Sequence, residues 1–333
     1  LQRLGQFYLH DLILAALLLV NFLPRRQAGR RLRLFRPAAW FGLAGLISLV
    51  IAGFKLPLNE VLIGSLYLLR FLAYSLLIGL KVDRKFLLFF STAIAGLGLA
   101  QYLFLPDTRF LAGLNWDDHY YRLISTLFDP NFTGIILVLG LILICLKRPL
   151  SRPLLLLHLS ALLLTYSRGS YLALAAAGLC WALVGKKLKW FFLGIAVLAV
   201  VLLALPRPGG EGVKLERWFS IEQRVDNYRA GVSLWLKGPV FGLGFNTLRF
   251  YRGDPISHAA SGLDSSLLFV LATTGIVGLI AYLNLLRSLW QKNLLLRLSL
   301  VALLIHSLFV NSLFYPFVMI WLFSLASLDK RRT

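Results

Sequence analysis

An arginine between serine and glycine, in the stretch Tyr166-Ser167-Arg168-Gly169-Ser170, separates two apolar segments. The guanidinium of Arg168 carries paired donors that match the oxygens of a phosphate. If the flanking segments span a membrane, the turn lies at the membrane boundary, where it is well placed to hold a phosphate. The structural alternative is an ordinary interfacial anchor.

A second set of basic residues belongs to a predicted amphipathic helix. Its apolar face has positions spaced by three and four: Trp218, Ile221, Val225, Tyr228, Val232 and Trp235. Arg217 and Arg224 flank this face on one edge, and Arg229 flanks it on the other. Such a helix can lie on a membrane surface with its guanidinium groups at head-group level. Arginines that merely snorkel are the alternative.

The hydrophobic composition of the chain predicts the type of element that carries these residues. The 333 residues are 59% hydrophobic and 15% charged, and the mean hydropathy is +0.77. This composition predicts an all-α polytopic membrane protein, because each span needs roughly 20 apolar residues in a row. Long unbroken apolar runs, such as 190–205, do not fit the alternation of a β-barrel strand.

Eleven apolar segments are candidate transmembrane helices: 9–24, 38–54, 61–80, 86–105, 132–146, 153–166, 170–185, 190–205, 265–286, 294–310 and 314–328. The chain starts at Leu1 without a signal peptide. We therefore expect further N-terminal sequence, and a twelfth helix in the full-length protein. Cys145 and Cys180 lie within apolar runs, so neither a disulfide framework nor a thiolate zinc site is expected.

The net charge is +21, and most of the basic residues lie in the connections between these segments. Every second connection is basic, and together these connections hold 21 of the 35 cations but only two acids, Asp83 and Asp329. This is the positive-inside pattern, and it predicts a cytoplasmic C-terminus and an external Leu1. The basic charge therefore indicates topology, and a nucleic-acid partner is not expected.

Two connections on the outer side are long, from Pro106 to Asn131 and from Pro206 to Asp264. An active site should therefore face outward. Three parts of the chain are predicted: an N-terminal transmembrane bundle of eight spans (1–205), an extracytoplasmic loop with the interfacial helix (206–264), and three C-terminal transmembrane helices (265–333). Within this loop, Gly238 and Pro239 should end the helix, and the glycines at 242 and 244 should form a turn with Asn246.

Three polar residues fall inside predicted spans. Arg70 should face a partner or a wet cavity, because a mid-span cation costs roughly 2.5 to 3.5 kcal/mol. His158 and His306 are each expected to make an interhelical hydrogen bond rather than to bind a metal or transfer a proton.

Four stretches, in this order, resemble the bacterial O-antigen ligase and polymerase superfamily. They are Arg122 to Asn131, which ends in Phe-Asp-Pro-Asn; the Ser-Arg-Gly turn at 167–169; Arg224 through Trp235 to Gly-Pro-Val-Phe-Gly-Leu-Gly at 238–244; and Asp264-Ser-Ser-Leu-Leu leading to Thr-Gly-Ile-Val-Gly at 274–278. The resemblance covers most of the chain from about residue 120 onward.

The resemblance implies a metal-independent glycosyltransferase of the bacterial inner membrane, with no cofactor. Its donor would be an undecaprenyl-diphosphate-linked glycan on the outer face, and its acceptor a glycan or a lipid; membrane lipids and a chain-length regulator are the further expected partners. Arg168 and Arg224 would bind the diphosphate, and Arg217 and Arg229 are further candidates. Such an enzyme must neutralise phosphate charge and deprotonate or orient an acceptor hydroxyl.

Asp264 stands where ligases of this family carry a histidine. This departure favours a repeat-unit polymerase over a ligase. Asp264 or His258, six residues earlier, would be the catalytic base. Against this, an aspartate before Ser265 is a good helix N-cap, and capping together with the helix dipole would lower its pKa and weaken it as a base.

Three alternatives remain open. Peptidoglycan polymerases of the shape, elongation, division and sporulation family share the outward loop and an aspartate before a similar helix. A metal-dependent glycosyltransferase is suggested by Trp116-Asp117-Asp118-His119, which could bind a divalent cation. A transporter or flippase would predict charged residues along several spans and paired broken helices.

Overall fold

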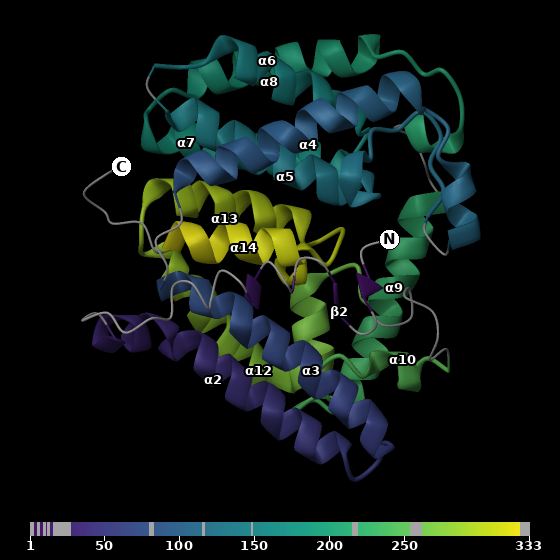
Figure 1. Cartoon of the computed structure of the whole chain (residues 1–333), viewed down its shortest axis with the longest axis vertical. Coiled ribbons are helices and arrows are strands. Elements are labelled where there is room, and N and C mark those ends of the chain that lie inside the picture. The colour runs from purple at the N-terminus through teal and green to yellow at the C-terminus, as the bar shows by residue number, and fades with distance from the viewer. Residues whose placement is uncertain are drawn as a thin grey trace. The chain divides into compact units, whose positions relative to one another are not determined.

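In the computed structural model, the described part of the chain consists mainly of helices joined by loops, with one pair of two-residue strands (Figure 1). That part comprises residues 3–4, 7–8, 11, 14–15, 28–79, 83–114, 117–147, 149–214, 219–253 and 262–326. The strands β1 (Arg3–Leu4) and β2 (Phe7–Tyr8) pair antiparallel, with Leu4 opposite Phe7. The all-α polytopic class is confirmed.

Ten of the predicted segments correspond to helices: α2 (Ala28–Ala52), α3 (Leu58–Ser75), α4 (Arg84–Phe104), α5 (Pro130–Leu146), α6 (Arg152–Leu164), α7 (Arg168–Val184), α8 (Leu188–Ala204), α12 (Ser266–Trp290), α13 (Leu294–His306) and α14 (Pro316–Ala326). The segment 9–24 lies largely outside the described residues. By length and composition, four described helical stretches can cross a bilayer: 35–52, 58–78, 84–104 and 266–290. The other six are apolar but shorter, so the total of eleven spans stays a prediction.

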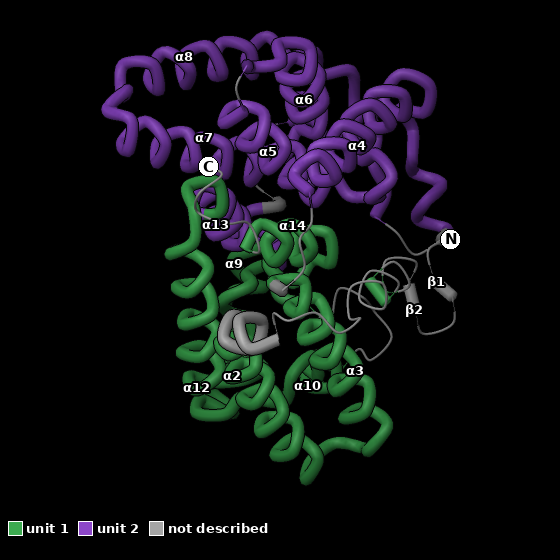
Figure 2. Tube along the Cα trace, turned by 60° about the vertical axis from the view of Figure 1, so that its left-hand side comes forward, with its two compact units in different colours: residues 1–82, 224–296, 313–333 green, residues 83–223, 297–312 purple. Residues whose placement is uncertain are grey.

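Packing divides the chain into two compact units, coloured separately in Figure 2. Unit 1 contains residues 1–82, 224–296 and 313–333, and unit 2 contains residues 83–223 and 297–312. Each unit therefore joins segments that are distant in sequence. The predicted three-part division, with boundaries at 205 and 264, concerns membrane topology and is a different description.

Unit 2 has helix α5 at its centre. Residues 133–144 of α5 are all buried, whereas no residue of α8 is buried. His158 of α6 bonds through Nε2 to the hydroxyl of Ser91 on α4 at 3.1 Å, and through Nδ1 to the carbonyl of Leu154 at 2.9 Å. The predicted interhelical bond of His158 is confirmed.

In unit 1, α2 packs against α12 and α3 around a cluster of aromatic rings. Phe41 of α2 lies 5.1 Å from Phe71 of α3 and 4.9 Å from Tyr282 of α12, between ring centroids. Arg70 has the charged partner expected for a mid-span cation, because its Nη2 lies 2.7 Å from a carboxylate oxygen of Asp11.

Helix α12 is broken at Gly275, which has φ 65° and ψ −166°. A loop, residues 238–247, is inserted at this break, and we call it the inserted loop. The N–H groups of Leu243 and Gly244 donate to the carbonyls of Ala272 and Thr273, at 3.0 and 3.1 Å. In the other direction, Ile276 N–H donates to Pro239 and Val277 N–H donates to Val240, at 3.0 and 3.2 Å.

The inserted loop replaces the hydrogen bonds that the break removes. In an unbroken helix the carbonyls of Ala272 and Thr273 would accept from the N–H groups of Ile276 and Val277. Here all four groups bond to the loop backbone instead. Irregular backbone at membrane depth is tolerated only where protein or water satisfies it, so this loop and this helix must fold together.

Small residues make the close approach feasible. A Cβ at Gly275 would overlap the carbonyl of Val240, and a Cβ at Gly242 would overlap the backbone of Thr273. Gly242 has φ 77°, Gly244 φ 109° and Asn246 φ 60°, and the turn predicted at these residues is confirmed. The glycines of both family motifs thus allow one backbone to lie on another.

Candidate active site

Asp264 lies in unit 1, immediately before the N-cap of α12. The cap is Ser265, whose side chain accepts from the N–H of Leu268 at 3.4 Å. The expectation that Asp264 caps the helix is therefore wrong, because the following serine occupies the extended cap position, with φ −112° and ψ 124°. The Asp264 carboxylate is left available for another role.

Helix α9 (Phe219–Leu236) holds Asp264 in place. The backbone N–H of Asp264 donates to Oδ1 of Asn227 at 3.0 Å. Farther along α9, a Cβ at Gly231 would meet the side chains of Leu268 and Leu263, so α9 lies close to the start of α12. Arg224 is one turn before Asn227 and shares this face.

The pKa of the Asp264 carboxyl is raised from its ordinary value, because the half-buried group loses solvent; the charges of Arg224 and Arg252 act in the opposite direction. Desolvation exceeds the attraction of the two cations. This corrects the expectation that capping and the helix dipole lower the pKa. A carboxylate with a raised pKa is a better general base than an exposed one.

Arg252 is a member of the site that the sequence patterns did not indicate. It follows the short helix α10 (Leu248–Tyr251), and its Nη1 donates to the carbonyl of Gly262 at 3.0 Å. Burial lowers its pKa, and the negative charge of Asp264 raises it. No helical periodicity marks position 252; the only signal is an arginine in the long outward loop, twelve residues before Asp264.

The other residues predicted for this site are either on another face of α9 or outside the residues that the structure describes. Arg229 is on the exposed side of α9, and its Nη1 lies 3.1 Å from Oδ1 of Asp226, with side chains 77% and 71% exposed. Arg217 and His258 lie outside the described residues. The roles of these three residues therefore stay predictions.

Several apolar side chains of α9 are partly exposed, whereas Leu234 is buried. Ile221, Val225 and Val232 are 40 to 43% exposed, whereas the face with Asn227 and Gly231 packs against residues 263–268. An exposed apolar stripe beside a half-buried arginine suits a helix at a membrane interface. Helix α9 can therefore contact lipid on one side and position Asp264 on the other.

The Ser-Arg-Gly turn lies in unit 2. Ser167 is the N-cap of α7, and Arg168 is the first helical residue, with a half-buried side chain. The Ser167 hydroxyl donates to Oδ1 of Asn131 at 3.0 Å, and the Ser170 hydroxyl donates to Ser167 Oγ at 2.9 Å. His306 of α13 bonds to Ser170 Oγ at 3.2 Å, which confirms its predicted interhelical bond.

The segment from Arg122 to Asn131 packs against this turn. Arg122 is only 6% exposed, and its Nε donates to the carbonyl of Thr165 at 3.0 Å. Leu123 N–H donates to the carbonyl of Leu164 at 2.8 Å. Asp129 caps α5 by accepting from the N–H groups of Asn131 and Phe132, at 2.6 and 2.8 Å.

The four motifs of the family resemblance thus meet in pairs. Residues 122–131 and 167–169 contact one another in unit 2. Residues 224–244 and 264–278 contact one another in unit 1. Each of these segments includes, or directly adjoins, a connection that the charge pattern assigns to the outer side of the membrane.

The acidic motif Trp116-Asp117-Asp118-His119 lies in the first long outward segment. Asp117 and Asp118 are exposed, and Trp116 lies outside the described residues. Over the stretches that the structure covers, no group of three or more His, Cys, Asp or Glu side chains is arranged to hold a metal ion.

Residues 153–283 match the family model described as O-antigen ligase. The matched range contains the Ser-Arg-Gly turn, helix α9, the inserted loop and Asp264, and it ends within α12. The resemblance to the O-antigen ligase and polymerase superfamily is confirmed over this range. Residues 122–131 precede it. No individual curated protein matches the chain.

Proposed function

We propose that this protein is a glycosyltransferase of the bacterial inner membrane that polymerises glycan repeat units on the outer face. The donor is a glycan linked to undecaprenyl diphosphate, and the acceptor is a second lipid-linked glycan. One observation supports the proposal: Asp264, a half-buried carboxylate with a raised pKa, is influenced by the charges of two arginines and lies beside helix α9, which has exposed apolar side chains.

In the proposed reaction, an acceptor hydroxyl attacks the anomeric carbon of the donor sugar. The bond from that carbon to the phosphate oxygen breaks, and the carrier leaves as its diphosphate. Asp264 takes the proton of the attacking hydroxyl. Arg224 and Arg252 neutralise the charge that develops on the leaving diphosphate. Guanidinium groups suit this task because their donors match two phosphate oxygens at once.

Arg168 is proposed as a further diphosphate ligand. Its turn is held by a hydrogen bond from Ser167 to Asn131 and by a hydrogen bond between Ser170 and His306. Its half-buried guanidinium extends from the first turn of α7, where the helix dipole favours an anion.

The description of the matched family favours a second candidate, the ligase reaction, in which the acceptor is lipid A rather than a repeat unit. Asp264 in place of the histidine of ligases favours the polymerase. A transporter is disfavoured by the break in α12, because its freed backbone groups bond to the inserted loop rather than to a substrate pathway.

A reconstituted assay tests the proposal. Purified protein in lipid vesicles is given a lipid-linked repeat unit alone, and products are separated by length. A ladder of polymers supports the polymerase, and the Asp264→Asn variant should form it about a hundredfold more slowly. A product seen only when lipid A is added would establish the ligase instead. Movement of intact lipid-linked glycan across the vesicle, without bond transfer, would overturn both.

A further inference from the structure

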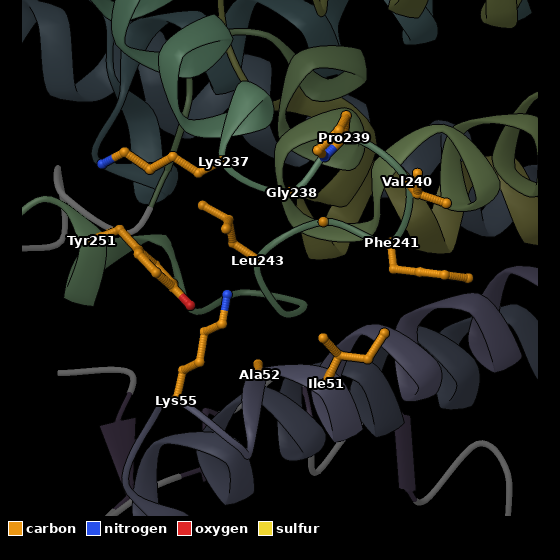
Figure 3. A pocket seen from close by; sticks show the side chains of 11 residues that line it. Ile51, Ala52, Lys55, Lys237, Gly238, Pro239, Val240, Phe241, Leu243 and Tyr251 are labelled. Carbon is orange, nitrogen blue, oxygen red and sulfur yellow. The ribbon is translucent and has the colours of Figure 1, made fainter.

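A pocket of about 180 Å³ lies where the inserted loop meets the end of α2, within unit 1 (Figure 3). The inserted loop supplies residues 238–243, and α2 supplies Ile51 and Ala52. The polar groups are Lys55, Lys237 and Tyr251. The volume is below the roughly 300 to 1,000 Å³ of pockets that enclose a whole small molecule, but it suffices for a small head group.

Two of the polar side chains meet in one part of the pocket. In Figure 3, the Lys55 amine and the Tyr251 hydroxyl point toward one another beneath Leu243, whereas the Lys237 side chain extends above Tyr251 with its amine directed away from these two groups. The sequence contains eleven lysines. Only Lys55, Lys214 and Lys237 lie on connections that the charge pattern assigns to the outer side, and two of these three line this one pocket.

The walls of the pocket are rigid and partly apolar. Its backbone wall is the stretch that bonds to α12 through four hydrogen bonds at the Gly275 break. Val240 in this wall is 51% exposed, and Phe54, which precedes Lys55 in the chain, is 87% exposed. Amines next to exposed apolar side chains fit a ligand that has a phosphate and a hydrocarbon chain.

This pocket is separate from the site at Asp264. Lys237 follows α9 and lies 13 residues beyond Arg224, which corresponds to roughly 20 Å at 1.5 Å per residue. One phosphate cannot contact both ends of that helix. The two places are connected by α10, since Tyr251 lines the pocket and the next residue, Arg252, acts on Asp264.

We propose that Lys55, Lys237 and Tyr251 bind the carrier phosphate of the lipid-linked acceptor. This inference rests on the proposed polymerase function, in which donor and acceptor are both anchored to lipid phosphates. The donor diphosphate binds to the arginines near Asp264, and the carrier phosphate of the acceptor binds in the lysine pocket. The acceptor glycan then extends from the pocket to Asp264.

The test compares the Lys55→Gln, Lys237→Gln double variant with Lys214→Gln, which removes an outward lysine that does not line the pocket. With the lipid-linked acceptor, the double variant should raise the acceptor KM about tenfold, given the strength of charge-assisted contacts, with kcat and the donor KM unchanged. With the same glycan freed of its lipid, double variant and wild type should be equal. A rise in the donor KM, or an equal loss with the lipid-free acceptor, overturns the proposal.

A binding measurement separates this inference from the proposed function. A short polyprenyl phosphate is titrated into the purified wild-type protein, the double variant and Arg224→Ala. If the wild type transfers no glycan but binds this probe, and only the double variant loses affinity, the pocket is a lipid-phosphate site although the function is wrong. If the double variant binds normally, or inorganic phosphate competes as well as the lipid phosphate, the pocket assignment fails.

Discussion

Oδ1 of Asn227 accepts a hydrogen bond from the backbone N–H of Asp264 at 3.0 Å. This contact joins α9 to the start of α12 and leaves the Asp264 carboxylate out of the helix cap. Asn227→Ala should therefore displace Asp264 and lower kcat without removing the base. Because Asn227 does not touch the reacting atoms, Asn227→Ser, which retains an acceptor, should recover part of the loss in the polymer-length assay.

Asp264→Asn should lower turnover by about a hundredfold, the usual contribution of a positioned general base. The helix start should be unaffected, since Ser265 is the cap. Turnover of purified protein at matched expression checks this. As a control, Ser265→Ala should cost about 1 kcal/mol of stability and little activity. Normal turnover of Asp264→Asn would remove the base assignment, and a large loss in His258→Ala would move it to that residue.

The raised pKa of Asp264 gives a pH signature with a definite sign. Deprotonation is needed for activity, so kcat/KM should fall as pH decreases through the pKa of the free enzyme, at a higher pH than for an exposed aspartate. Stability runs the other way, because a raised pKa stabilises the fold at low pH and this contribution is lost as pH rises. Asp264→Asn should thus be at least as stable as wild type at neutral pH. Thermal unfolding across pH measures it.

Ala substitution at Arg224, Arg252 or Arg168 should each reduce transfer at least tenfold, since a charge-assisted bond contributes roughly 1.5 to 3 kcal/mol. Lys should restore only part of the activity, because it lacks the paired donors. Arg229→Ala is the matched control on α9: its exposed pair with Asp226 should contribute little. Equal losses at Arg229 and Arg224 would mean that the helix acts by charge alone.

Gly275→Ala should destabilise the protein by more than about 2 kcal/mol, because an L-residue at positive φ costs roughly 1 to 2 kcal/mol and the new Cβ would overlap the Val240 carbonyl. Gly96→Ala in α4 is the control, since nothing lies within 4 Å of its added Cβ. Unfolding temperatures in detergent compare the two. Equal stability would show that α12 can close without the inserted loop.

Topology is tested by cysteine labelling in a background with Cys145 and Cys180 replaced. The charge pattern predicts that a cysteine at Lys55 reacts with an impermeant reagent from outside, and that one at Lys187 reacts only after the membrane is opened. Labelling of position 187 from outside would reverse the orientation and place the Asp264 site in the cytoplasm.

The positions of ten helices could be predicted because hydrophobic length is a property of a continuous segment. The sequence indicates that Arg70 needs a charged or polar partner, but it does not identify Asp11, because this residue is 59 positions away. The cap of α12 could not be assigned, because Asp264, Ser265 and Ser266 are all good capping residues and local backbone angles decide among them. Arg252 was missed because no periodic pattern includes it.

The contact between the inserted loop and α12 could not be predicted from the sequence, for a different reason. Its contacts with α12 are between backbone groups, and backbone groups leave no side-chain pattern in the sequence. The glycines at 242 and 275 gave the only signal. The sequence pattern indicates a turn at Gly242 and a family motif at Gly275, whereas in the structure the backbones at these two glycines pack together with the facing segments of one contact.

The break at Gly275 also affects how the chain enters the membrane. It divides α12 into pieces of about nine and fifteen residues, each shorter than the roughly 20 needed to cross a bilayer. Residues 238–247 are synthesised first, so they are present when these pieces leave the ribosome. Without the loop, the whole stretch 266–290 is still long and apolar enough to cross a bilayer, so we expect a truncated chain that starts after residue 247 to integrate it as one continuous helix without the break.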